Sequence, residues 1–267
     1  MSLNVLTAGS GPSMLLLHGF TGTARMWSNQ IEAWSASHRV IAPDLLGHGG
    51  SAAPSDPAVY ALERQADSLA DLLVLLEATP AIVVGYSMGA RLALVLALEH
   101  PASVARLILE SPSAGIVDDR DRAARREADE QLAEVVERDG VDAFIARWEA
   151  LPIFASHAEL PADVRAHQRV ERRRHTPAGL AASLRGAGQG AMSPLHERLS
   201  MVVAPSLVLG GALDPTGLAR ARAVAERLSN ARLEVIAGAG HTPHIEAPDA
   251  FLRITNDFLA ATTATIA

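Results

Sequence analysis

The residue with the clearest chemical potential is a serine held between two glycines, in Gly85-Tyr86-Ser87-Met88-Gly89. A short apolar run, residues 82–84, precedes this motif, and an Ala- and Leu-rich stretch, residues 92–98, follows it. This order predicts a buried strand, a sharp turn and a helix, the context in which a serine becomes an exposed nucleophile. The turn needs glycines because it is too tight for side chains on either side of the serine.

A serine hydroxyl reacts only when a base activates it, and the base needs a carboxylate to orient it. In one large class of serine enzymes the three residues follow one another as serine, acid and histidine. Asp214 follows the apolar run 206–211 after two residues, and His241 follows the apolar run 233–236 after four. Taken alone, Asp214 could be a turn residue and His241 a structural loop histidine. Together the three positions predict a catalytic triad of Ser87, Asp214 and His241.

Negative charge that develops during such a reaction needs backbone N–H donors. We expect one donor at Met88, the residue after the serine, and one at Phe20, in Leu17-His18-Gly19-Phe20. His18 and His48 are expected to brace loops. No cluster of His, Asp and Glu has the spacing of metal ligands, and no glycine-rich loop follows a strand as a phosphate site would. The sequence therefore predicts neither a metal nor a cofactor.

Strands and helices must alternate to bring these residues together. Six apolar runs predict buried strands, and helical patterns separate several of them, at residues 62–76, 92–99 and 218–228. The runs are residues 14–17, 40–42, 82–84, 107–109, 207–209 and 233–236. Alternation predicts a mostly parallel sheet, with residues 3–7 as an antiparallel edge strand. Ser87, Asp214 and His241 all follow strands, so they should share the carboxyl edge of this sheet.

The alternation stops between residues 115 and 198, where the pattern is almost wholly helical and Pro and Gly mark the breaks. We expect a helical lid at 115–198 inserted into a core of residues 1–114 and 199–267. The lid should cover the carboxyl ends of the strands, where such sheets bind ligands. Its second half is basic, since residues 164–198 hold seven Arg against two Glu.

Composition narrows the range of partners. The chain has 267 residues, a net charge of −7 and no cysteine, and all 23 of its basic residues are arginine. The acidic balance argues against nucleic acid, and the apolar runs are too short to cross a membrane. Without a basic, apolar leader at the start, the expectation is a cytoplasmic protein that acts on a small molecule. The oligomeric state is left open.

Several motifs together resemble the α/β-hydrolase superfamily: Leu17-His18-Gly19-Phe20, Gly47-His48-Gly49-Gly50-Ser51, the serine motif and Gly240-His241. Other motifs resemble one family within it, the 2-succinyl-6-hydroxy-2,4-cyclohexadiene-1-carboxylate synthases of menaquinone biosynthesis. These are Arg91, Glu110-Ser111-Pro112-Ser113-Ala114-Gly115, Trp148-x-x-Leu151-Pro152-Ile153-Phe154 and Leu184-Arg185-Gly186-x-Gly188-x-Gly190. The implied fold is an α/β-hydrolase fold, a mostly parallel sheet flanked by helices, with an inserted helical lid.

This resemblance implies a carbon–oxygen lyase that eliminates pyruvate from 2-succinyl-5-enolpyruvyl-6-hydroxy-3-cyclohexene-1-carboxylate. Ser87 would act as a base, so no acyl-enzyme would form. The substrate carries three carboxylates, which arginine binds well because its planar group donates paired hydrogen bonds. The family pattern places substrate-binding arginines at Arg91, Arg125 and Arg172, and Trp148 and Tyr86 are further candidates. The alternative to substrate binding for Arg125 is a structural role, as the i,i+4 ion-pair partner of Asp129 on a solvated helix.

The chain departs from the family pattern at four places that lie outside the triad: Ala90, Ala114, Thr216 and Thr242-Pro243-His244. A serine hydrolase with the same triad, either a carboxylesterase or a carbon–carbon bond hydrolase, is therefore the alternative. A non-enzymatic binding module is a third interpretation, and the complete set of Ser, Asp and His argues against it. Only a site for several carboxylates separates the lyase from a simple esterase.

Overall fold

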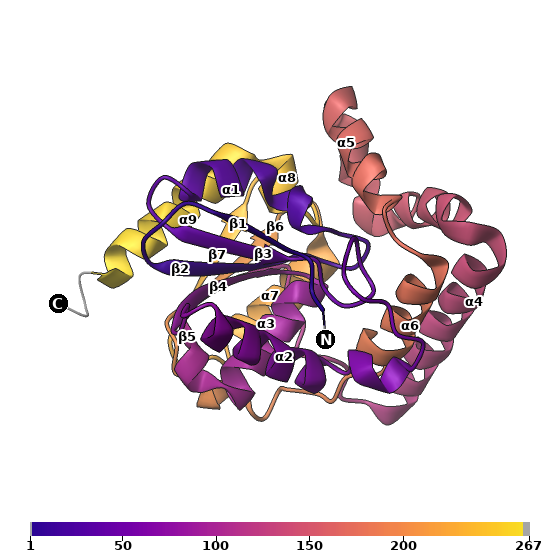
Figure 1. Ribbon diagram of the computed structural model, residues 1–267, viewed down its shortest axis with the longest axis horizontal. Helices are drawn as coiled ribbons and strands as arrows, with labels where there is room; N and C mark the ends of the chain where they lie inside the picture. Colours follow the sequence, from indigo (N-terminus) through magenta and orange to yellow (C-terminus); the bar gives the residue numbers. More distant parts are fainter. Residues whose placement is uncertain (1, 264–267) are drawn as a thin grey trace.

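A single twisted sheet forms the centre of the molecule (Figure 1). The structure is a computed structural model that describes residues 2–263. Within those residues seven strands pair in the order β1-β3-β2-β4-β5-β6-β7. The strands are β1 (Val5–Ala8), β2 (Ser13–Leu17), β3 (Arg39–Pro43), β4 (Ala81–Tyr86), β5 (Val104–Glu110), β6 (Ser206–Gly211) and β7 (Ala231–Ile236).

The pairing confirms the fold class that the alternating pattern predicts. β1 runs antiparallel to β3 with Val5 opposite Pro43, and every other neighbouring pair is parallel. The central strands are apolar almost throughout because helices cover both faces of a parallel sheet. All three predicted triad residues follow strands of this parallel part, which brings them to one edge.

Two layers of helices sandwich the sheet. One face carries α1 (Ser28–Trp34), α8 (Pro243–Glu246) and α9 (Pro248–Thr263), and the other carries α2 (Leu62–Leu75), α3 (Met88–Glu99) and α7 (Pro215–Ala225) (Figure 1). Side chains alternate along each strand, so Leu15 and Leu17 pack with α2 and α3 while Met14 and Leu16 pack with α1 and α9. Short 3-10 turns join the elements at η1 (Ala24–Trp27), η2 (Pro57–Tyr60), η3 (Pro101–Ser103) and η5 (Leu199–Met201).

Between β5 and β6 the chain forms helices that project to one side of the sheet (Figure 1). They are α4 (Asp119–Glu149), η4 (Pro152–Glu159), α5 (Ala162–Arg172) and α6 (Pro177–Ala187). A small core that includes Phe144, Leu180 and Leu184 joins α4 to α6. α4 bends at Gly140, whose φ of 79° lies in a region that glycine adopts readily. The domain boundaries at 114/115 and 198/199 stay a prediction. Residue 1 of the first core segment and residues 264–267 of the second lie outside the described residues.

Among residues 2–263, no helix combines the length and the apolar character that a membrane span requires.

Candidate active site

The serine motif forms a strained turn between β4 and α3. Ser87 has φ 52° and ψ −105°, an unusual conformation for a residue with a side chain. A β-carbon added at Gly85 would lie 2.4 Å from the Gly89 carbonyl oxygen, and one added at Gly89 would lie 2.1 Å from the Leu17 carbonyl oxygen. The close approach of β4, α3 and β2 therefore requires both glycines, and it holds Ser87 at the edge of the sheet.

Ser87, His241 and Asp214 form a continuous hydrogen-bonded chain. His241 Nε2 lies 3.1 Å from Ser87 Oγ, and His241 Nδ1 lies 2.8 Å from Asp214 Oδ2. A carboxylate can only accept, so Nδ1 carries the proton and Nε2 is left to accept from the serine hydroxyl. This is the geometry in which histidine can remove a proton from serine. The three residues that the sequence places in a triad thus lie within contact of one another.

Asp214 serves the triad and the fold together. It is the N-cap of α7, where its Oδ1 accepts a hydrogen bond from Gly217 N–H at 2.9 Å. Burial alone would raise the pKa of the Asp214 carboxyl, but the hydrogen bonds from His241 and Gly217 outweigh burial and the pKa is lowered. Asp214 therefore stays ionised near neutral pH, as an orienting carboxylate must.

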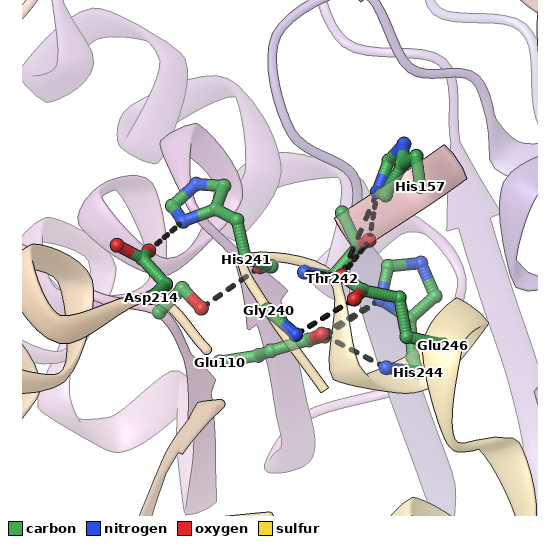
Figure 2. A network of polar contacts seen from close by, with 9 residues as sticks. Glu110, His157, Asp214, Gly240, His241, Thr242, His244 and Glu246 are labelled. Carbon is green, nitrogen blue, oxygen red and sulfur yellow. Dashed lines mark hydrogen bonds and ion pairs between the residues drawn. The ribbon is translucent and has the colours of Figure 1, made fainter. Parts of the chain in front are cut away.

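A second carboxylate, Glu246 on α8, fixes the loop that carries His241 (Figure 2). Glu246 accepts hydrogen bonds from Gly240 N–H at 2.7 Å, from Thr242 N–H at 2.9 Å and from Thr242 Oγ1 at 2.7 Å. These donors flank His241 on both sides. His157, from η4 of the lid, donates to Thr242 Oγ1 at 2.5 Å and lies 3.6 Å from Glu246. One carboxylate therefore connects the catalytic histidine loop to the lid.

A buried, hydrogen-bonded pair of side chains fixes the far end of the same loop (Figure 2). Glu110, the last residue of β5, accepts hydrogen bonds from His244 N–H at 3.0 Å and His244 Nδ1 at 2.9 Å. Neither side chain reaches solvent, and Trp27 stacks on the His244 ring at 4.2 Å. Ser111 adds a bond to the His241 carbonyl oxygen at 2.9 Å. The backbone around His241 is thus held by several side chains from distant parts of the sequence.

The loop that carries Phe20 has a brace of its own. His18 Nδ1 bonds to the Gly19 carbonyl oxygen at 2.8 Å, and His18 Nε2 accepts from Leu45 N–H at 2.9 Å. Burial lowers the pKa of His18 to about 4, so the ring is neutral and can make both bonds. His18 does not line the cavity at Ser87. Its two hydrogen bonds instead hold the backbone of the loop that carries Phe20.

A cavity of about 410 Å³ opens between the sheet edge and the lid, over Ser87 and His241. Phe20 and Met88, the predicted sources of oxyanion N–H groups, both line it. Trp148, from α4 of the lid, also lines the cavity and packs edge-on to Phe20 at 5.1 Å. This volume suits a small molecule. The contact between Phe20 of the core and Trp148 of the lid therefore forms part of the cavity wall.

Two of the three predicted arginines line this cavity. Arg91 is buried, donates to the Ala187 carbonyl oxygen at 2.8 Å and lies in the first turn of α3, four residues from Ser87. Burial, and next the charge of Arg125, lower the pKa of Arg91 to about 10, so it stays charged at pH 7. Arg125 pairs through Nε with Asp129 Oδ1 at 2.8 Å, which is the i,i+4 pair that the sequence suggests. Both residues line the cavity, and their contact with a ligand stays a prediction.

Arg172, the third predicted arginine, lies elsewhere. It is absent from the lining of the cavity over Ser87 and lines a neighbouring cavity of about 340 Å³ instead. Its side chain is buried, with Nη1 3.1 Å from Glu149 Oε1 and the guanidinium carbon 5.4 Å from the centre of the Phe154 ring. Phe154 lines both cavities. A role for Arg172 in binding the ligand stays a prediction, and it would require Phe154 or Arg172 to move.

Tyr86 precedes the serine and lines the cavity, with its ring 5.5 Å from the His241 ring. Burial, and next the nearby Glu110, raise the pKa of the Tyr86 phenol well above its ordinary value, so the hydroxyl stays protonated. Tyr86 thus lines the cavity with a neutral O–H, and its contact with a ligand stays a prediction.

Sequence reasoning missed several residues of the site. Asp129 and Arg220 line the cavity, and Glu110 and Glu246 hold the histidine loop. The sequence indicates Asp129 only as an ion-pair partner of Arg125, and Glu110 only as part of a family motif. Arg220 and Glu246 have no local signal, because each reaches the site through packing between distant segments. Across residues 2–263, no group of three or more His, Asp and Glu side chains is placed to bind a metal ion.

Comparisons with known proteins agree on the fold and favour one activity. Residues 12–248 match the model of the α/β hydrolase fold family. The chain is 37% identical, over 95% of its length and 94% of the relative, to a Bacillus subtilis (strain 168) protein named "Putative 2-succinyl-6-hydroxy-2,4-cyclohexadiene-1-carboxylate synthase". It is 32% identical to the synthase of that name from Enterobacter sp. (strain 638), over 90% of the chain and 88% of the relative.

Two solved structures are similar along nearly the whole chain. MenH from S. aureus superposes with a TM-score of 0.92 and 31% identity, over 97% of this chain and 98% of that one. A thermophilic esterase from Thermogutta terrifontis, solved with malate bound, superposes with a TM-score of 0.87 and 30% identity, over 97% of this chain and 93% of that one.

Proposed function

The chain belongs to the α/β-hydrolase fold family and, within it, to the 2-succinyl-6-hydroxy-2,4-cyclohexadiene-1-carboxylate synthases, and from this premise we propose its reaction. We propose that it eliminates pyruvate from 2-succinyl-5-enolpyruvyl-6-hydroxy-3-cyclohexene-1-carboxylate. The single observation that carries this proposal is the cavity over Ser87, which combines an intact triad with arginines. A simple ester would need no such arginines.

The proposed chemistry is a proton abstraction followed by loss of the enolpyruvyl group. His241 draws the proton from Ser87, and the serine oxygen removes the ring proton beside the succinyl ketone. The electrons of that C–H bond form a new ring double bond, the existing double bond shifts by one position, and the C–O bond to the enolpyruvyl group breaks. The proton on His241 returns to the departing enolpyruvate, which becomes pyruvate. Atoms and charge balance without water or a cofactor.

The ketone oxygen gains negative charge as the ring proton leaves. The backbone N–H groups of Met88 and Phe20 are proposed to stabilise that charge, in the way that an oxyanion hole stabilises a tetrahedral intermediate. Both residues line the cavity beside Ser87, which supports this role. The same donors therefore serve an enolate-like state, and no covalent bond to serine is required.

Arg91 and Arg125 are proposed to bind substrate carboxylates. Arg91 is buried, and within residues 2–263 its side chain bonds to the Ala187 carbonyl oxygen and Met192 Sδ rather than to a carboxylate. A substrate carboxylate would therefore restore stabilisation that the charge of Arg91 lost on leaving water. Trp148 is proposed to pack against the substrate ring, and the Tyr86 hydroxyl to donate a hydrogen bond inside the cavity. Arg172 is paired with Glu149 and lies over the Phe154 ring, so contact with the substrate would require Arg172 or Phe154 to move.

The test is a coupled assay with the purified protein. The cyclohexene substrate is added together with lactate dehydrogenase and NADH, and pyruvate release is followed as loss of NADH absorbance. We expect turnover on this substrate and only weak hydrolysis of p-nitrophenyl acetate. Brisk ester hydrolysis without pyruvate release would contradict the proposal.

Ester hydrolysis is the second candidate, because the Thermogutta terrifontis esterase superposes nearly as well as MenH. The triad serves either reaction, since serine attacks the carbonyl carbon in one and removes a proton in the other. An esterase of this kind would act on esters of small dicarboxylic acids. Comparing mono- and dicarboxylic p-nitrophenyl esters in the same assay separates this candidate from a general esterase.

A further inference from the structure

A third arginine, Arg220, also lines the cavity over Ser87 and has no assigned role. It lies on α7, the helix that Asp214 caps, one turn after Gly217. Gly217 lines the cavity as well, and residues three apart share one face of a helix. The face of α7 that starts at the catalytic acid therefore turns toward the ligand and ends in a guanidinium group.

The groups along the cavity wall leave the guanidinium of Arg220 without a direct partner among the described residues. Three arginines and one carboxylate, Asp129, line the cavity. Asp129 is already paired with Arg125, and Arg91 donates to the Ala187 carbonyl oxygen.

Arg220 is exposed, and within residues 2–263 its guanidinium makes no direct side-chain hydrogen bond or ion pair. Its charge acts at a distance on Asp214, whose two carboxylate oxygens already bond to His241 and Gly217. The N–H donors of Arg220 are therefore available to an anionic ligand at the cavity wall.

We propose that Arg220 binds one carboxylate of the substrate. The arginines that bind the substrate's carboxylates are then the three that line the cavity, Arg91, Arg125 and Arg220. Arg172 has the opposite surroundings: it is buried, paired with Glu149 and placed over the Phe154 ring outside this cavity. The inference rests on the proposed function, because it concerns a substrate with several carboxylates. It assigns the Asp214 side of the cavity to one of them.

The test compares Arg220→Gln with Arg222→Gln and Arg172→Gln by steady-state kinetics of pyruvate release. Arg222 lies two residues further on the same helix, is exposed, and does not line the cavity, so it is the matched control. We expect Arg220→Gln to raise KM about 10-fold with kcat within about twofold, since a hydrogen bond to a charged group is lost. Arg222→Gln should leave both constants unchanged.

Two kinetic results would overturn the inference. An unchanged KM in Arg220→Gln, with a raised KM in Arg172→Gln, would return the role to Arg172. A lowered kcat at unchanged KM in Arg220→Gln would mean that Arg220 acts only through the charge of Asp214.

A binding measurement keeps the inference testable if the wild-type protein releases no pyruvate, which would refute the proposed function instead. Malate is titrated into wild type, Arg220→Gln and Arg222→Gln by calorimetry, because the similar esterase was solved with malate bound. We expect Arg220→Gln alone to bind malate about 10-fold more weakly. Equal affinity in all three proteins, or no binding to wild type, would overturn the inference.

Discussion

Replacing Glu246 by glutamine should weaken both the fold and the catalytic histidine. Glu246 accepts from Gly240 N–H on one side and from the two Thr242 donors on the other. A glutamine has one acceptor oxygen, so its NH₂ group must face a donor on one of these sides. Losing one hydrogen bond to a charged group costs about 1.5–3 kcal/mol. At about 2 °C per kcal/mol for a chain of this length, Tm should fall by about 3–6 °C.

The pH dependence gives this prediction a sign. Burial raises the pKa of Glu246, but hydrogen bonds from His157, Ser156, Thr242 and Gly240 outweigh it, and the pKa ends well below its ordinary value. A lowered pKa in the folded state contributes stability above the unfolded value of about 4.3, and that stability is lost as the pH falls toward the folded pKa. The Tm difference between wild type and Glu246→Gln should therefore have its largest value near pH 7 and become smaller below about pH 4.

The assay is thermal unfolding by circular dichroism across this pH range, with kcat and KM measured at pH 7. Because His241 lies between the residues that Glu246 holds, kcat should fall while KM changes little. Glu226→Gln, an exposed change at the end of α7, is the control and should alter neither quantity. A Tm within 1 °C of wild type at pH 7, using the ~1.5 kcal/mol lower bound above, would refute the reasoning.

Three other changes test the site. Ser87→Ala should lower kcat by roughly 10⁴-fold at unchanged Tm, as for other triad serines, and a retained rate would exclude Ser87 as the base. Arg91→Met should lower kcat/KM about 10- to 150-fold, the equivalent of about 1.5–3 kcal/mol, and an unchanged ratio would make Arg91 purely structural. Tyr86→Phe should lower kcat/KM about 3- to 10-fold through loss of one neutral hydrogen bond, with circular dichroism confirming an intact fold; no loss would show that the hydroxyl does not contact substrate.

The fold and the triad were predictable because local patterns determine them. Apolar runs and helical stretches alternate along the core, and the turn at Ser87 needs its glycines within the motif itself. Strands of a parallel sheet end at a common edge, so Asp214 and His241 could be placed beside Ser87 from strand order alone. The position of Arg91 beside Ser87 was also predictable, because Arg91 lies in the first turn of the helix that follows the serine.

The remaining site residues depend on how distant segments pack. Arg172 has the expected place in the sequence, yet Glu149 and Phe154 hold its side chain away from the cavity. Arg220 looks like an ordinary arginine of a surface helix until α7 is placed beside the sheet edge. Glu246 follows the catalytic histidine by five residues, but only the folded loop turns its carboxylate back toward Gly240. The positions of these side chains depend on tertiary contacts, which local sequence patterns do not predict.

The most direct test of the central claim is the mass of the ring product formed in ¹⁸O-labelled water. Elimination with Ser87 as a base adds no water, so the product should equal the substrate minus pyruvic acid and carry no label. A ring product heavier by one water, with or without ¹⁸O, would show hydrolysis of the enolpyruvyl ether and contradict the account.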